Sequence, residues 1–82
     1  MKVNDFIKSC DNNNIPRHWY AINKGLFPDT YILQQDYNSK WRFFYLDEKR
    51  NELDVTYFDT EEEACEHLYN KLLKELQYKA KY

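Results

Sequence analysis

Three runs of aliphatic and aromatic residues lie between residues 30 and 58, and they limit the possible folds most strongly. The runs are "TYILQQ" at 30–35, "KWRFFYL" at 40–46 and "LDVTYF" at 53–58. The segments "DYNS" and "DEKRNE" that separate them consist mainly of turn-forming residues. β-prone runs joined by short turns are typical of adjacent antiparallel strands. The sequence therefore predicts a three-stranded antiparallel sheet.

Alternation along the second and third runs predicts which side chains face the core. Side chains of a strand point alternately to the two faces of the sheet, so a register error of one residue would invert this assignment. We expect the core face to consist of Trp41, Phe43, Tyr45, Leu53, Val55 and Tyr57. We expect the opposite face to consist of Arg42, Phe44, Asp54, Thr56 and Phe58.

Helical patterns flank the three runs. The apolar residues Val3, Phe6, Ile7 and Cys10 follow helical spacing, and the turn-prone segment 11–14 ends that pattern. Near the C-terminus, Thr60 and Glu63 have the spacing of a capping box. The amphipathic stripe that follows is made of Cys65, Leu68, Tyr69, Leu72 and Leu76.

The predicted fold is α+β, in the order α-β-β-β-α, with two helices packed on one face of the sheet. Between the first helix and the sheet lies the segment 15–28, which we expect to pack against the domain because it is rich in large apolar side chains. Pro16 could open a single helical turn that ends at Tyr20, and Gly25 could adopt the positive φ of a turn.

Length and composition predict a single compact domain spanning residues 1–82. Aromatic residues make up 18% of the chain, which favours a folded core in a protein of this size. The sequence shows neither an apolar run of the roughly 18 residues that a membrane helix needs nor a signal peptide. We therefore expect a cytoplasmic protein. Its cysteines Cys10 and Cys65 should then be reduced and packed, although a disulfide between them remains an alternative.

The search for catalytic or metal-binding patterns favours none of them. The single glycine is too few for a phosphate-binding loop. Cys65 and His67 are two positions apart and point to different sides of a helix, a spacing that matches no zinc motif. Cys10 lies on an apolar stripe, so a packed thiol is favoured over a nucleophile. We therefore predict no enzyme activity and no cofactor.

Charge is concentrated in residues 47–66, which contain nine acidic and two basic residues, a net charge of −7. The order α-β-β-β-α also occurs in double-stranded RNA-binding domains, which place lysines at the start of the last helix. Here the same place holds the three glutamates 61–63, which would repel phosphates. Acidic surfaces favour basic protein partners instead. We therefore predict neither nucleic-acid nor membrane binding.

Three stretches of the chain, within residues 15–73, resemble small bacterial immunity proteins that neutralise polymorphic or contact-dependent toxins. The stretches are "IPRHWYAINKGL", "KWRFFYLDEKRN" and "FDTEEEACEHLYNKL". Lys24 and the turn "DEKRN" depart from the family pattern, which tends to have glycine there. The residues that match the pattern are Ile15, Pro16, Tyr20, Gly25, Leu26, Trp41, Tyr45, Phe58, Glu62, Glu63, Ala64 and Cys65.

The resemblance implies an immunity protein that binds a cognate toxin stoichiometrically, often a nuclease with a basic groove, in bacterial competition. An acidic surface would steer such an association, and aromatic anchors would stabilise the complex. Two alternatives are a regulatory or adaptor domain for an unrelated protein, and acids that are merely a solvated face. The candidate partner-binding residues are Asp47, Glu48, Glu52, Asp54, Asp59, Glu61 and Glu62, with Phe44, Tyr57 and Phe58 as anchors.

Overall fold

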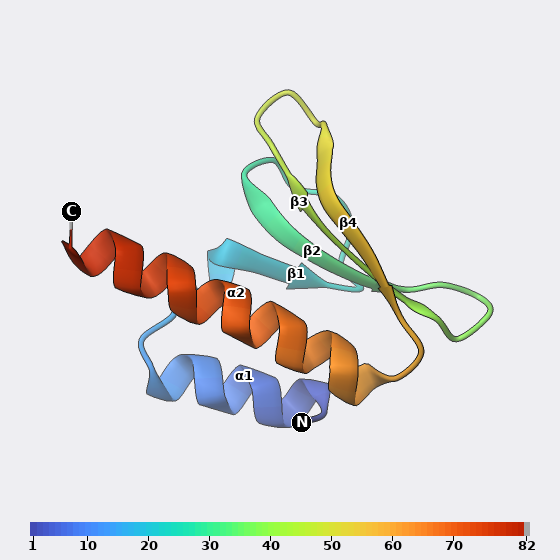
Figure 1. The fold of residues 1–82 in the computed structure, drawn as a ribbon, viewed down its shortest axis with the longest axis horizontal. Coiled ribbons are helices and arrows are strands. Elements are labelled where there is room, and N and C mark those ends of the chain that lie inside the picture. Colours follow the sequence, from blue (N-terminus) through green and yellow to red (C-terminus); the bar gives the residue numbers. More distant parts are fainter. Residues whose placement is uncertain (82) are drawn as a thin grey trace.

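A computed structural model describes the backbone of residues 1–81 and the side chains of residues 1–79. Two helices pack together beside a mixed four-stranded sheet (Figure 1). The elements are α1 (Val3–Asn12), a 3-10 turn η1 (Arg17–Trp19), β1 (Tyr20–Ile22), β2 (Thr30–Gln35), β3 (Trp41–Leu46), β4 (Glu52–Phe58) and α2 (Glu61–Lys81).

The sheet has the strand order β1-β2-β3-β4, with β1 parallel to β2 and the other neighbours antiparallel. The predicted antiparallel arrangement of the last three strands is confirmed, but the prediction of a three-stranded sheet is wrong. The extra strand, β1, has only three residues and follows the predicted turn at Pro16, so it shows no recognisable alternation. The connection back to β2 turns at Asn23, Gly25 and Asp29, all with positive φ.

The main core lies between the sheet and the two helices. Phe6 and Cys10 of α1 are buried, and so is the predicted stripe of α2 at Cys65, Leu68 and Leu72. The sheet contributes Leu33, Trp41 and Phe43 to the same cluster, so both helices cover one face, as predicted. One half of the predicted capping box is confirmed, because the N–H of Glu63 donates to Thr60 Oγ1 at 3.2 Å. The carboxylate of Glu63 accepts from the hydroxyl of Thr60 at 3.0 Å, where a capping box would use the Thr60 backbone N–H.

A second, smaller cluster lies on the opposite face of the sheet. It consists of Ala21, Ile32, Phe44 and Leu46, each at most 5% exposed. The guanidinium of Arg42 lies over the ring of Phe44, 4.4 Å from its centroid. The predicted outer position of Phe44 is therefore right with respect to the helices, but its side chain is fully buried.

The predicted core face of β4 is wrong, and a β-bulge contributes to the error. Thr56 pairs with Phe43 and Leu53 pairs with Tyr45, so two residues of β4 lie opposite Phe44 alone. One of these two residues is Asp54, which has a φ of 58°. A bulge of this kind changes which side chains point to which face.

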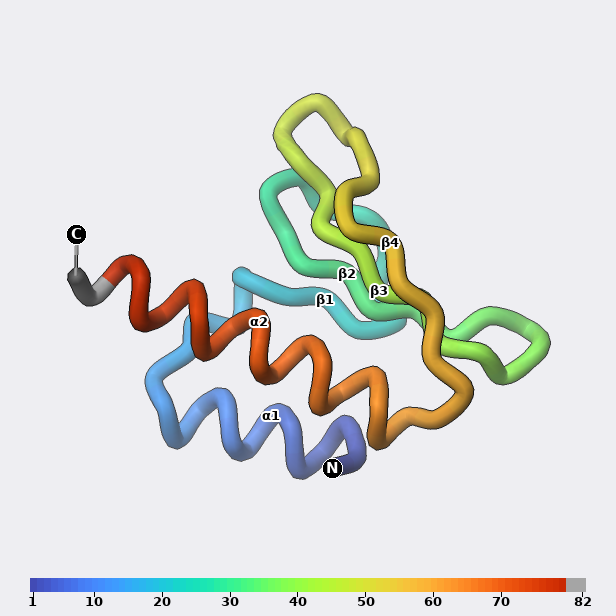
Figure 2. The backbone as a smooth tube through the Cα atoms, in the orientation of Figure 1, coloured from blue at the N-terminus to red at the C-terminus, as the bar shows by residue number. Residues whose placement is uncertain are grey.

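The three β4 side chains that were predicted to lie in the core are exposed: Leu53 by 44%, Val55 by 41% and Tyr57 by 60%. Phe58, which was assigned to the outer face, packs against the main core instead. Leu53 pairs with the half-buried Tyr45 on the helix side, but this end of the β3–β4 hairpin projects beyond α2 (Figures 1 and 2).

Candidate functional site

The predicted acidic residues form two groups rather than one patch. One group lies in and after the β3–β4 turn, at Asp47, Glu48, Glu52 and Asp54. The other lies beyond the far end of β4 and at the start of α2, at Asp59, Glu61 and Glu62. The strand between them, Glu52 to Phe58, is about 20 Å long at the usual rise per residue. Each group must therefore be considered separately.

In the turn group, two acids have structural roles. The carboxylate of Asp47 accepts hydrogen bonds from the backbone N–H groups of Lys49 (2.9 Å) and Asn51 (2.8 Å), which close the turn. The backbone hydrogen bond from Asn51 is the main reason why the pKa of Asp47 lies below its usual range. Glu52 forms an ion pair with Arg42. Within residues 1–79, neither Glu48 nor Asp54 forms an ion pair.

In the group near α2, each of the three acids contacts the protein itself. Asp59 pairs with Lys40 at 2.9 Å, and Glu62 lies 3.9 Å from Lys2. Glu61 accepts a hydrogen bond from the backbone N–H of Val3 at 2.8 Å. Glu61 thus occupies the first position of α2 and also satisfies a free N–H at the start of α1. This contact favours a structural role for Glu61 over the predicted role in partner binding.

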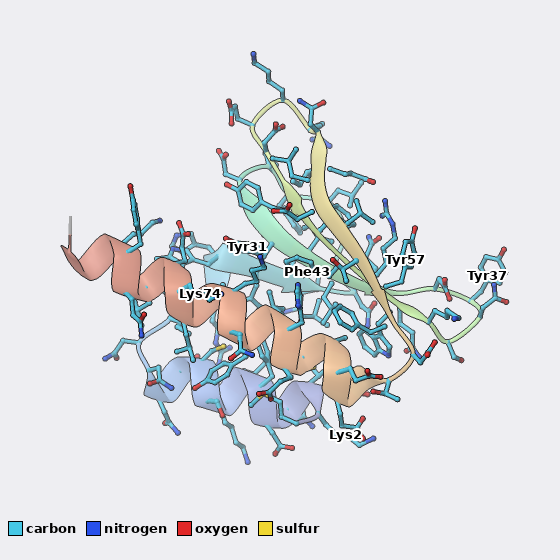
Figure 3. All side chains as sticks on the ribbon, in the orientation of Figure 1. Lys2, Tyr31, Tyr37, Phe43, Tyr57 and Lys74 are labelled. Carbon is cyan, nitrogen blue, oxygen red and sulfur yellow. The ribbon has the colours of Figure 1, made fainter. Side chains whose placement is uncertain are left out.

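Of the three predicted aromatic anchors, only Tyr57 is exposed. Phe44 has no exposed surface, and the half-buried ring of Phe58 lies 5.0 Å from the His67 ring. Tyr57 pairs with Arg42 across the sheet and therefore lies on the outer face, whereas Phe43 lies between the sheet and α2 (Figure 3). Phe44 and Phe58 are not available at the surface as anchors in this structure.

Exposed acids and apolar side chains lie along the last strand and in the turn before it, and we call this set of residues the β4 surface. Sequence reasoning missed Leu53 and Val55 as surface residues, because it assigned them to the core. The signal that could have corrected this was Asp54, since aspartate tolerates the positive φ that a bulge requires better than most residues. The β4 surface consists of Glu48, Leu53, Asp54, Val55 and Tyr57.

The cysteine thiols and the His67 imidazole, which could in principle take part in catalysis, pack against other side chains of the domain. Burial is the main factor that raises the pKa of Cys10 to about 12 and that of Cys65 to about 11, so both are protonated thiols at neutral pH. They are free cysteines, as predicted. Burial, followed by the charges of Lys71 and Lys74, lowers the pKa of His67. Its Nε2 is buried and has no hydrogen-bond partner among the described residues.

A cavity of about 560 Å³ lies beside β1 and opens to solvent next to Phe27 and Lys24. Arg17 also lines it, but its guanidinium is held by the carboxylate of Asp11 at 2.7 Å. Among the described residues, no group of three or more His, Cys, Asp or Glu side chains is arranged to hold a metal ion. Over the same residues, no helix is both long and apolar enough to cross a membrane.

Comparisons with known proteins found no matching family model, no matching curated protein and no matching solved structure.

Proposed function

We propose that this protein is an immunity protein, which binds a cognate bacterial toxin domain in the cytoplasm and neutralises it stoichiometrically. The resemblance of residues 15–73 to such proteins supports this function, and the β4 surface supplies a surface for the contact. The toxin domain would have a basic surface, as the active-site groove of a nuclease does. The protein would act by binding alone, without catalysis or a cofactor.

The observation that carries the proposal is the composition of the β4 surface. Tyr57 is 60% exposed although it is a large aromatic residue, and tyrosines of this kind are frequent hot spots in protein interfaces. Asp54 lies on the same strand, and Glu48 lies in the turn before it; neither charge is neutralised in an ion pair by a cation of residues 1–79. A strand that carries an exposed aromatic side chain and an unpaired acid favours a basic protein partner.

Co-purification with the product of a neighbouring toxin gene tests the function directly, followed by rescue of growth in cells that express the toxin. We expect a one-to-one complex and full rescue by the wild-type protein. Tyr57→Ala should weaken the complex by about 2 kcal/mol or more, which is roughly thirtyfold in Kd. Failure of the wild-type protein both to bind and to rescue would contradict the proposal and would favour an adaptor for another protein.

The role of charge needs a matched pair of variants. Glu48→Gln with Asp54→Asn removes two charges from the β4 surface, and asparagine tolerates the positive φ at position 54. Glu66→Gln with Glu75→Gln removes two charges from α2 and serves as the control. We expect the first pair to slow association several-fold at low salt and to reduce its salt dependence, because steering is lost. Equal association rates for the two pairs would mean that the acids are only a solvated face.

A further inference from the structure

The free edge of β4 offers backbone hydrogen-bonding groups in addition to side chains. β4 is the last strand of the sheet, and within residues 1–81 only β3 pairs with it. The other end of the sheet is formed by β1, which has three residues, whereas β4 has seven. An unpaired strand of this length can accept a further strand from another chain.

The register identifies Tyr57 as a residue whose backbone N–H and C=O point away from β3. The N–H of Asp47 donates to the C=O of Asn51 at 3.1 Å, so these two residues form a hydrogen-bonded pair at the turn. Hydrogen-bonded pairs alternate along an antiparallel ladder, which makes Phe43 direct its backbone groups toward its partner Thr56. The next residue of β4, Tyr57, directs its own groups to the free edge.

The bulge limits where another strand can pair. Bulges interrupt the regular spacing of backbone groups and are one means by which proteins protect a sheet edge. Beyond the bulge at Asp54 and Val55, the residues Thr56, Tyr57 and Phe58 pair regularly with β3, and Tyr57 is the central one. The edge therefore accepts a short extended segment that pairs through the backbone groups of Tyr57.

Charge selects among the occupants of this edge. A second copy of β4 would bring together two strands that each carry Glu52, Asp54 and Asp59, and the net negative charge of both segments disfavours this association. A strand that carries lysine or arginine would instead bring an opposite charge near Asp54, which forms no ion pair within residues 1–79, whereas Asp59 already pairs with Lys40. The edge therefore favours a basic extended segment over self-association.

We infer that a basic, extended segment of the toxin adds to the free edge of β4 as a fifth strand. This inference depends on the proposed function and specifies how the β4 surface would be used. The backbone groups of Tyr57 would pair with the added strand, and its exposed ring would cover one face of that strand. The unpaired charge of Asp54 would favour a basic segment.

The first experiment uses two synthetic probes and the whole ¹⁵N-labelled protein. One probe is a capped hexapeptide of alternating lysine and valine, and the other has glutamate in place of lysine. We expect the lysine peptide to shift the amide signals of residues 55–59 and to slow hydrogen exchange at the Tyr57 N–H. The glutamate peptide should bind about tenfold more weakly at low salt, as expected for the loss of a few exposed charge pairs. Equal shifts with both peptides, or no shifts in β4, would overturn the inference.

A matched pair of substitutions separates backbone pairing from contact with the side chain. Tyr57→Pro removes an N–H that points to solvent, and proline is tolerated on edge strands in that orientation. Tyr57→Ala removes the ring but keeps the N–H. Once circular dichroism shows that both variants fold, the lysine peptide should still bind Tyr57→Ala and should lose binding to Tyr57→Pro. Unchanged peptide binding by a folded Tyr57→Pro protein would refute strand addition.

The same two variants distinguish failure of this inference from failure of the proposed function. If the wild-type protein binds the toxin and a folded Tyr57→Pro protein binds it as well as Tyr57→Ala does, the protein is an immunity protein that does not use strand addition. If the wild-type protein binds the lysine peptide along β4 but neither binds the toxin nor rescues growth, strand addition survives and the immunity function is wrong.

Discussion

Glu61 tests most directly which acidic residues stabilise the fold and which are available to bind a partner. The sequence places it in a run of three glutamates that looks uniform. The structure gives it a distinct role, because its half-buried carboxylate accepts the Val3 N–H at 2.8 Å while it occupies the first turn of α2. One carboxylate therefore lies at the N-termini of both helices, where negative charge is favourable.

The expected cost of Glu61→Ala follows from this geometry. Loss of a side-chain acceptor at a helix N-terminus costs about 0.5–2 kcal/mol, and loss of a favourable charge near a helix dipole costs about 0.3–1 kcal/mol. Because these effects overlap in one group, we expect a decrease of about 1–2 kcal/mol in the free energy of unfolding. Glu61→Gln keeps an acceptor and removes only the charge, so it should cost about half as much.

Chemical denaturation with two optical probes measures these differences, and thermal unfolding should show a decrease of about 4–8 °C in Tm for each kcal/mol. The control is Glu62→Ala, because Glu62 is exposed and its nearest cation, on Lys2, is 3.9 Å away. Its substitution should change stability by no more than about 0.5 kcal/mol. If Glu61→Ala and Glu62→Ala are equally stable, the contact between the two helices contributes nothing and Glu61 returns to the set of candidate binding residues.

Two further predictions concern the core and its histidine. Trp41→Ala should lower the free energy of unfolding by about 3–5 kcal/mol, because the Trp41 side chain is only 4% exposed. Tyr57→Ala should change the free energy of unfolding by about 0.5 kcal/mol or less, because Tyr57 is 60% exposed. Similar denaturation midpoints for both variants would show that the face assignment of β4 is wrong. Burial lowers the pKa of His67 from 6.5, so the unfolded chain binds a proton there at a higher pH than the folded protein does. The contribution of His67 to the free energy of unfolding is fully present above its unfolded-state pKa of 6.5. This contribution decreases as the pH falls from 6.5 to the lower pKa of the folded state. His67→Gln should flatten the dependence of the free energy of unfolding on pH below pH 6.5. A slope that persists in His67→Gln would exclude His67 as its cause.

Elements with local signals could be predicted from the amino-acid sequence. The helical spacing of Phe6 and Cys10, the capping pair Thr60 and Glu63, and the stripe of α2 all depend on residues within a few positions of one another. The three β-prone runs and their turns were local signals of the same kind. For these elements, periodicity and turn chemistry were sufficient because the pattern repeats within one segment.

Tertiary structure decided the features that depend on pairing between distant segments. β1 is too short to show a periodic pattern, and it is a strand because it pairs with β2 in parallel. The bulge at Asp54 is defined by the pairing of β4 with β3, and this pairing leaves Val55 exposed. Position in the sequence could not reveal this, because a change of one residue in register moves side chains to the other face.

The same distinction applies to the candidate site. The sequence correctly concentrated attention on the acids of residues 47–66, since charge can be counted without a fold. Only the structure could separate Glu61, held by Val3 some 58 positions away, from Glu48 and Asp54, which form no ion pair within residues 1–79. The physical reason is that charge belongs to a residue, whereas its availability to a partner depends on which groups the fold brings within hydrogen-bonding distance.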